Sequence, residues 1–176
     1  PATVSGMSID RQCSSGMMAI ATAAKQIIVD GMEVVIGGGL ESISLAQTQK
    51  MNLDRYVDKN LVTKHKHIYM PMLQTAEVVG KRYNVSRDAQ DVYSLESQIR
   101  TAKAQVEGKF DQEIFPVTTS MGVMNKETKE ISFVENTLTK DEGNRPTTTI
   151  EGLNSLKPVI EGGLITAGNA SQLSDG

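Results

Sequence analysis

Residues 1–39 carry a strand–helix–strand pattern, which restricts the fold class more than any other part of the sequence. Residues 1–12 are predicted to form a strand and its exit, and a helix is expected to begin near Cys13. The apolar residues of this helix recur at helical spacing: Met17, Ile20, Ala24, Ile27 and Ile28. A second short strand is expected over 33–36, directly before three glycines at 37–39. Two strands joined by a helix form a βαβ unit, so the sequence predicts an α/β fold.

The sequence changes in composition after Ser44 and predicts a mixed α+β region. The expected elements, in order, are a helix over 74–83, a helix over 86–108, a strand over 113–117, β-rich or irregular structure over 118–140 and a short helix ending before Pro158. Ser86 is a suitable N-cap for the longest of these helices. Its apolar residues are expected to pack in the core: Val92, Leu95, Ile99, Ala102 and Val106.

Composition excludes several classes of protein. The 176 residues have a net charge of -3, with 39% hydrophobic and 22% charged residues, as in soluble globular proteins. We expect neither nucleic-acid binding nor membrane insertion, because basic blocks and long apolar runs are missing. A single cysteine excludes an internal disulfide and a thiolate zinc site, so a reducing, cytoplasmic setting is expected. His65 and His67 lie in a lysine-rich stretch, which favours a solvated loop over a metal site.

Cys13 is the first candidate for chemistry. It lies where the first predicted strand gives way to a helix, and a helix start stabilises negative charge through its free N–H groups. A thiolate in such a position can attack a carbonyl and hold an acyl group as a thioester. A small buried hydrophobic residue is the alternative, and the residues around Cys13 leave the two interpretations about equal.

Other candidate ligand contacts have equally simple structural explanations. The glycine-rich segment 37–42 could line a ligand or turn the chain, and we favour the turn. The small residues of 167–171 could admit a ligand or form a tight loop. Arg145 could bind phosphate, although most such side chains are solvated. Met72 lies in an apolar patch with Met70, for which ordinary packing is the favoured interpretation.

Five sequence motifs resemble those of the thiolase family and occur in the family's order. They are Asp10-Arg11-Gln12-Cys13-Ser14-Ser15-Gly16, Gly38-Gly39-Leu40-Glu41-Ser42-Ile43-Ser44, Thr75-Ala76-Glu77, Ser86-Arg87-Asp88-Ala89-Gln90-Asp91 and Thr166-Ala167-Gly168-Asn169-Ala170-Ser171. Each alone is weak, but together they span nearly the whole chain. The chain looks like an internal part of a thiolase, most similar to the acetyl-CoA acetyltransferase type.

The resemblance implies a part of the thiolase fold divided into three regions. Residues 1–45 would be the nucleophile-bearing βαβ piece of the N-terminal domain. Residues 46–165 would form an α+β loop domain that covers coenzyme A. Residues 166–176 would return to the N-terminal domain as a strand. Relatives of full length form dimers and tetramers, so a homodimer or homotetramer is implied.

The resemblance also implies a reversible Claisen condensation between acyl-CoA and acetyl-CoA. Cys13 would carry the acyl group, and its backbone N–H is a plausible oxyanion donor. Coenzyme A would be a substrate, with no tightly bound cofactor. By position, the residues that match coenzyme A contacts are Met72, Arg145, Ala167, Gly168 and Ser171. Ser171 is the strongest of these matches, because its motif is intact.

Some parts of the family pattern are different or missing. Ile43 replaces a usual methionine and Leu73 a usual glycine, while Gly152 and Ile160 replace family contacts to the nucleotide. The family's G-H-P histidine, N-E-x-F asparagine and C-x-G cysteine do not occur in these residues. The chain by itself is therefore expected to lack turnover, for want of a general base. Two alternatives are a non-catalytic coenzyme A-binding or interaction module and a lipid-carrier relative, and the intact Cys13 segment disfavours the latter.

Overall fold

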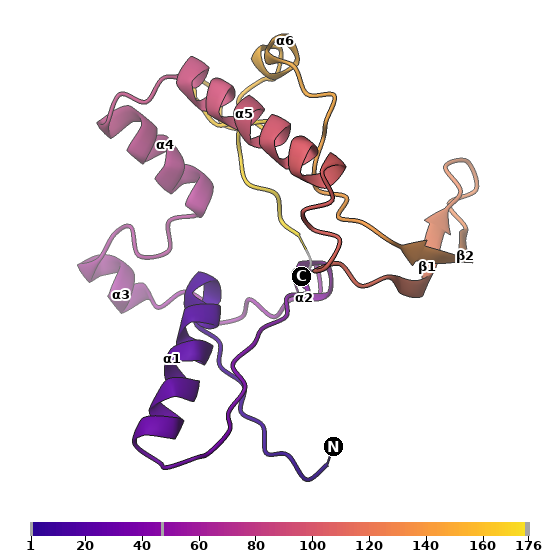
Figure 1. The fold of residues 1–176 in the computed structure, drawn as a ribbon. Helices are drawn as coiled ribbons and strands as arrows, with labels where there is room; N and C mark the ends of the chain where they lie inside the picture. Colours follow the sequence, from indigo (N-terminus) through magenta and orange to yellow (C-terminus); the bar gives the residue numbers. More distant parts are fainter. Residues whose placement is uncertain (1, 47, 175–176) are drawn as a thin grey trace. The chain divides into compact units, whose positions relative to one another are not determined.

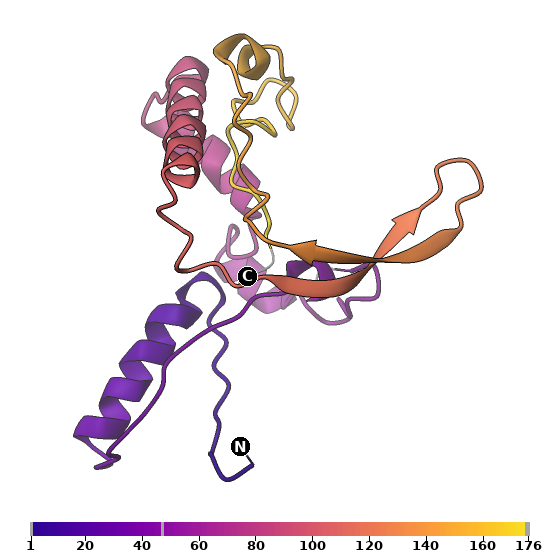
Figure 2. The same ribbon diagram turned by 45° about the vertical axis from the view of Figure 1, so that its right-hand side comes forward.

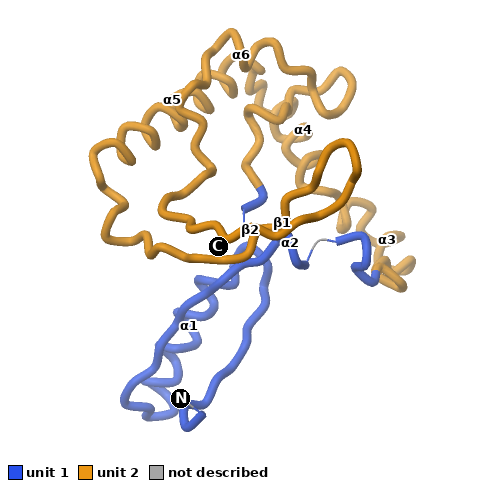
Figure 3. The backbone as a smooth tube through the Cα atoms, turned by 90° about the vertical axis from the view of Figure 1, so that its right-hand side faces the viewer, with its two compact units in different colours: residues 1–52, 173–176 blue, residues 53–172 orange. Residues whose placement is uncertain are grey.

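The computed structural model describes residues 2–46 and 48–174. The chain forms two compact units, one of residues 1–52 with 173–176 and the other of residues 53–172 (Figure 3). Cys13 belongs to the first unit, whereas the other five candidate residues belong to the second. The three expected regions include positions 1, 47, 175 and 176, which lie outside the described residues.

The first unit is built around one long helix. The 3-10 turn η1 (Gln12–Ser14) leads directly into α1 (Ser15–Ile28), and the short α2 (Ile43–Ala46) follows later (Figure 1). The frequent alanines of α1 favour the helix. After its end, Gly31 adopts a φ of 70° and the Met32 N–H donates to the Gln26 carbonyl at 3.2 Å. Glycine accepts this left-handed conformation without strain, which confirms Gly31 as part of the helix stop.

The two strands expected on either side of α1 are not formed. Residues 5–11 and 34–42 have no regular secondary structure, and Val34 and Ile36 are 81% and 92% exposed. A strand requires a hydrogen-bonded neighbour, and neither segment has one within the described residues. The βαβ prediction is therefore wrong for its strands and right for its helix. The return strand expected over 166–176 is likewise not formed in its described part, where residues 167–169 form a turn and residues 171–174 have no regular secondary structure.

The second unit contains four helices, three of which begin at a side-chain cap. They are α3 (Lys59–Lys64), α4 (Met72–Arg82), α5 (Arg87–Val106) and α6 (Ile150–Asn154). Side-chain oxygens of Asp58, Ser86 and Thr149 cap α3, α5 and α6 respectively by accepting N–H groups of the first turn. Both longer helices expected from the sequence are confirmed, with α4 beginning two residues early.

An antiparallel hairpin joins α5 to α6. Its strands, β1 (Val117–Met124) and β2 (Ile131–Leu138), pair from Val117 with Leu138 to Met124 with Ile131 (Figure 2). In the connecting turn, Asn125 Oδ1 accepts the N–H groups of Glu127 and Thr128. The β-rich expectation for 118–140 is confirmed. The strand expected over 113–117 is wrong, because pairing begins only after Pro116, which has no N–H to donate.

Buried residues gather where α4, α5 and α6 meet the segment after residue 162. Among the described residues, the buried ones are Glu77, Gly80, Asp91, Leu153, Ile165 and Thr166. The apolar stripe expected to pack in the core is exposed in large part, with Val92 58% exposed. Instead, α5 turns Asp91 inward and contacts α6. No helix of the described residues is both long and apolar enough to cross a bilayer.

Candidate functional site

Cys13 is exposed and lies within the turn that precedes α1. Two side chains hold this turn. Asp10 Oδ1 accepts the Gln12 N–H at 2.8 Å, and Ser15 Oγ accepts the Arg11 N–H at 2.8 Å while donating to the Gln12 carbonyl at 2.7 Å. Gln12 has a φ of 51°, a left-handed conformation that costs a non-glycine residue roughly 1 kcal/mol. The expected position of Cys13 at a helix start is therefore observed.

Residues 164–172, here called the small-residue loop, are folded by their own side chains. Thr166 Oγ1 accepts the N–H groups of Gly168 at 3.1 Å and Asn169 at 3.3 Å. Asn169 Oδ1 accepts the Thr166 N–H in return at 2.8 Å. The Ala170 N–H donates to the Thr166 carbonyl at 3.1 Å. These bonds define a tight turn over 166–170 that uses two polar side chains on its inner side.

A chain of polar contacts fastens the small-residue loop to α5 and α6. Asn169 Nδ2 donates to Asp91 Oδ1 at 3.0 Å and to the Leu164 carbonyl at 3.1 Å. Asp91, which is fully buried, pairs through Oδ2 with Arg87 Nε at 2.7 Å. Arg87 Nη2 then donates to the Leu153 carbonyl of α6 at 2.6 Å. The buried carboxylate thus has a charged partner and an amide partner, which its burial requires.

Helix α4 fastens the start of the same loop. The buried carboxylate of Glu77 accepts the N–H groups of Leu164 at 2.8 Å and Ile165 at 2.9 Å. Gly163, immediately before, has no room for a side chain because an added Cβ would collide with Glu77 Oε1. Charge-assisted bonds from two successive amides fix the direction in which the chain enters the loop.

The small-residue loop carries three of the residues expected to contact coenzyme A, two of them exposed and one packed against α6. Ala167 and Ser171 are exposed, and Gly168 is partly buried. An added Cβ on Gly168 would lie 2.5 Å from Leu153 Cδ2 and 2.6 Å from Leu156 Cδ1. Gly168 is therefore required for close packing on α6 and its end. The structure brings these three residues together on one short segment.

Arg145 is held near the end of the small-residue loop by backbone contacts. Gln98 Oε1 accepts the Arg145 N–H at 2.8 Å, while Gln172 Nε2 donates to the Gly143 carbonyl at 2.7 Å. The segment 143–145 and Gln172, the neighbour of Ser171, are thus joined directly. Met72 is the first residue of α4 and is 76% exposed.

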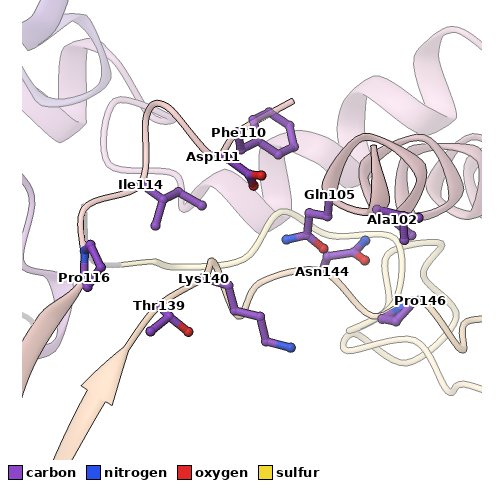
Figure 4. A pocket seen from close by; sticks show the side chains of 11 residues that line it. Ala102, Gln105, Phe110, Asp111, Ile114, Pro116, Thr139, Lys140, Asn144 and Pro146 are labelled. Carbon is purple, nitrogen blue, oxygen red and sulfur yellow. The ribbon is translucent and has the colours of Figure 1, made fainter. Parts of the chain in front are cut away.

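A cavity of about 630 Å³ lies elsewhere in the second unit (Figure 4). Its lining includes Phe110, Ile114 and Pro116 from the segment after α5, and Asn144 and Pro146, which flank Arg145. Its volume is in the range of small-molecule sites. The six candidate residues do not line it. Within the described residues, no cluster of three or more His, Cys, Asp or Glu is placed to bind a metal.

The residues that sequence reasoning missed are those that hold the loop: Glu77, Asp91, Gln98 and Asn169. Glu77 and Asp91 belonged to recognised motifs, but no role was expected for them. Neighbouring residues gave no signal for these carboxylates, because the adjoining Val78 and Val92 point to another side of the helix and are exposed. A buried carboxylate is costly unless it is paired, and the partners lie far away in the sequence.

Several thiolases match this chain over its whole length. The family description "Thiolase, N-terminal domain" covers residues 1–176. A 3-ketoacyl-CoA thiolase of Bacillus subtilis is 41% identical over 179 residues, covering 100% of this chain and 44% of the relative. A human peroxisomal 3-ketoacyl-CoA thiolase is also 41% identical, covering 100% of this chain and 40% of the relative. The chain therefore spans less than half the length of these relatives.

Solved structures give the same fold. The Bacillus anthracis acetyl-CoA acetyltransferase aligns with a TM-score of 0.75 at 34% identity, over 99% of this chain and 44% of that chain. Human mitochondrial 3-ketoacyl-CoA thiolase in complex with CoA aligns with a TM-score of 0.70 at 32% identity, over 95% and 42%. The dimeric peroxisomal thiolase of Saccharomyces cerevisiae aligns with a TM-score of 0.72 at 31% identity, over 95% of this chain and 40% of that chain. The expected partial thiolase fold is confirmed.

The expected cytoplasmic location is corrected by these relatives, because the human and yeast proteins are described as peroxisomal. The single cysteine does not distinguish the cytoplasm from other compartments, since one cysteine cannot form an internal disulfide in any of them. The five ordered motifs, the family match over residues 1–176 and the shared fold agree with one another. The chain belongs to the thiolase family and corresponds to its N-terminal domain.

Proposed function

We propose that the natural protein carrying this sequence transfers acyl groups between acyl-CoA and acetyl-CoA through a thioester on Cys13. The observation that carries this proposal is the exposed position of Cys13, the chain's single cysteine, in the turn before α1. An acyl-enzyme nucleophile must be reachable by its substrate and must have backbone N–H groups nearby for the developing oxyanion. A small buried hydrophobic residue, the alternative for Cys13, is disfavoured by this exposure.

The proposed reaction has two steps, acylation of Cys13 and condensation with acetyl-CoA. The Cys13 thiolate attacks the thioester carbonyl of acyl-CoA, the carbonyl carbon's bond to the coenzyme A sulfur breaks, and coenzyme A leaves as a thiol after taking up a proton. The methyl carbon of acetyl-CoA then loses a proton, attacks the Cys13 thioester and releases the Cys13 sulfur, giving 3-ketoacyl-CoA. Reversal cleaves a 3-ketoacyl chain with coenzyme A. A 3-ketoacyl-CoA thiolase or acetyl-CoA acetyltransferase activity is therefore proposed.

Coenzyme A is proposed as a substrate held by the second unit. The contacts we propose are Met72, Arg145, Ala167, Gly168 and Ser171. The exposed outer side of the small-residue loop supports this, because small side chains let an extended pantetheine arm approach the backbone. A related human enzyme is described in complex with CoA. The regions 1–45, 46–165 and 166–176 remain our proposed division of the chain.

A non-catalytic coenzyme A-binding module is the second candidate function for residues 1–176 alone. It is favoured by the two histidines, His65 and His67, which occur outside any G-H-P motif, and by the single thiol. The first candidate instead predicts that residues 1–176 alone acylate Cys13 without completing the condensation, whereas a non-catalytic module would leave Cys13 unmodified. A homodimer or homotetramer is proposed for the natural protein, since the yeast relative is described as dimeric.

The test is to incubate the natural protein with acetyl-CoA and to weigh the peptide that contains Cys13. We expect an acetyl increment on that peptide, released by added coenzyme A, and its loss in Cys13→Ala. The same reaction on residues 1–176 alone separates the two candidates: acetylation without 3-ketoacyl-CoA formation is expected. An unmodified Cys13 peptide in the natural protein, despite measured condensation activity, would rule out the proposed nucleophile.

A further inference from the structure

We propose that Asp91 and Asn169 are positioning residues that set the affinity for coenzyme A by fixing the small-residue loop. The proposal rests on the proposed function, in which the outer side of this loop contacts coenzyme A. Neither side chain needs to touch the ligand, because both face the inner side of the loop. Asp91 is fully buried and Asn169 is partly buried.

The side-chain amide of Asn169 makes three hydrogen bonds. Its Oδ1 accepts from the Thr166 N–H, and its Nδ2 donates to both Asp91 Oδ1 and the Leu164 carbonyl. A flipped amide would place Nδ2 against the Thr166 N–H and Oδ1 against the Leu164 carbonyl. The side chain therefore has one favourable orientation, and that orientation requires an acceptor on α5.

Asp91 supplies this acceptor in a fixed position. Its other oxygen is paired with Arg87 Nε at 2.7 Å, and Arg87 also donates to the Leu153 carbonyl. The carboxylate is thus held between a cation on one side and an amide on the other. Buried polar groups in such a network are costly to leave unpaired, which gives the network one arrangement. These hydrogen bonds therefore hold the loop in a fixed position relative to both α5 and α6.

Because Thr166 and Asn169 are held in place, the residues between them and just after them are held in place as well. Ala167 and Gly168 lie within the turn that Thr166 and Asn169 close, and Ser171 follows Asn169 by two residues. A shift of Asn169 moves all three residues together. A binding surface displaced by about 1 Å loses much of its interaction with substrate.

The change Asp91→Asn tests the link with almost no change in side-chain volume. If the new amide oxygen accepts from Arg87, its nitrogen faces Asn169 Nδ2, and two donors oppose each other. If the amide is reversed, the nitrogen opposes Arg87 instead. One contact is lost in either orientation. Adding Asn169→Asp restores a donor–acceptor pair between the two positions, although the new carboxylate then faces the Leu164 carbonyl, so rescue is partial.

The experiment measures coenzyme A binding by calorimetry and steady-state kinetics in the natural protein, well below the unfolding temperature. For Asp91→Asn we expect the Kd and KM for coenzyme A to rise about tenfold with kcat changed less than twofold. The double variant should recover part of the loss. Asp88→Asn, an exposed acid on the same helix with the same charge change, should bind as the unmodified protein does.

Other results would contradict either the proposed function or the proposed role of Asp91 and Asn169. If the unmodified protein binds no coenzyme A, the proposed function and this inference both fail. If it binds and Asp91→Asn lowers only Tm while Kd is unchanged, this inference alone fails. Should Asp91→Asn not fold, Asn169→Ser is measured in the same way, since it leaves the Arg87–Asp91 pair intact. An unchanged Kd in that variant also overturns the inference.

Discussion

The Glu77 carboxylate of α4 accepts the main-chain N–H of Ile165 at 2.9 Å across 88 positions of sequence. The same carboxylate accepts the Leu164 N–H, so one buried side chain satisfies two consecutive amides. The middle of α4 and a distant loop are thereby joined by one side chain. This contact explains how a unit with few buried hydrophobic side chains keeps the small-residue loop in place.

Replacing Glu77 with glutamine should destabilise the second unit. The substitution keeps the volume, and a glutamine Oε1 can still accept the N–H groups of Leu164 and Ile165, but the charge is lost and the new Nε2 donor replaces the Oε2 that accepts the Leu164 N–H at 3.0 Å. A buried amide left without an acceptor costs about 1–3 kcal/mol. Thermal unfolding followed by circular dichroism should show a lower Tm. Glu96→Gln is the control: it breaks an exposed pair with Arg100 and should cost at most about 0.5 kcal/mol. Equal Tm values for both variants would contradict the assigned role of Glu77.

Gly168→Ala should also lower stability, for a steric reason. The added Cβ would lie 2.5 Å from Leu153 Cδ2 and 2.6 Å from Leu156 Cδ1, far inside van der Waals contact. Overpacking of this kind costs typically about 1–3 kcal/mol. Urea unfolding should show a lower midpoint with an unchanged slope. Gly143→Ala is the matched control in the same unit, because its nearest atom would be 3.4 Å away. A Gly168→Ala protein as stable as this control would show that the two leucines rearrange freely.

Local sequence signals predicted the helices well because they depend on neighbours only. The Ser86 cap lies beside the helix it starts, and Gly31 lies just beyond the end of α1. Strand pairing and helix packing depend on residues that are distant in sequence, so local signals do not predict them. Residues 33–36 have a strand-like sequence, but a strand forms only against another strand. Likewise, the period of Val92 and Leu95 identified α5 as a helix, whereas its buried side depends on α6 and the small-residue loop.

The candidate site residues came from motifs that can be recognised in the sequence, whereas the contacts that support them did not. The motif containing Ala167, Gly168 and Ser171 is continuous in sequence, so it could be recognised directly. The bond between Asp91 and Asn169 spans 78 positions. No periodicity or spacing relates two residues so far apart, and only the folded chain reveals that separate motifs form one network.

The hydroxyl of Ser15 should matter for acyl transfer more than for access to Cys13. Ser15 Oγ bridges Arg11 and Gln12 on the N-terminal side of the nucleophile, where Gln12 is held in a left-handed conformation. Ser15→Ala removes both bonds and releases the turn. We expect Cys13 acetylation by acetyl-CoA to slow about tenfold, because productive geometry is lost. Modification of Cys13 by a small thiol reagent should continue at its former rate, since the thiol is exposed.

Ser14→Ala is the matched control for this test. Ser14 is adjacent and exposed, and its side chain makes no capping hydrogen bond. Its acetylation rate should equal that of the unmodified protein. Equal rates for Ser14→Ala and Ser15→Ala would mean that the bridge does not position Cys13. A slower reaction of Ser15→Ala with the small thiol reagent as well would instead indicate that access, and not geometry, had changed.

Residues 1–176 produced on their own should associate or bind a hydrophobic dye. Large apolar side chains are exposed in both units, including Ile36 in the first and Phe115 and Phe133 in the second. Many large apolar side chains exposed to water promote association or aggregation. The hairpin β1–β2 adds edges whose backbone groups remain available for pairing. Light scattering after size exclusion should therefore report species larger than the 19.1 kDa chain, together with enhanced dye fluorescence. A monodisperse monomer without dye binding would mean that these apolar side chains find partners within one chain in solution.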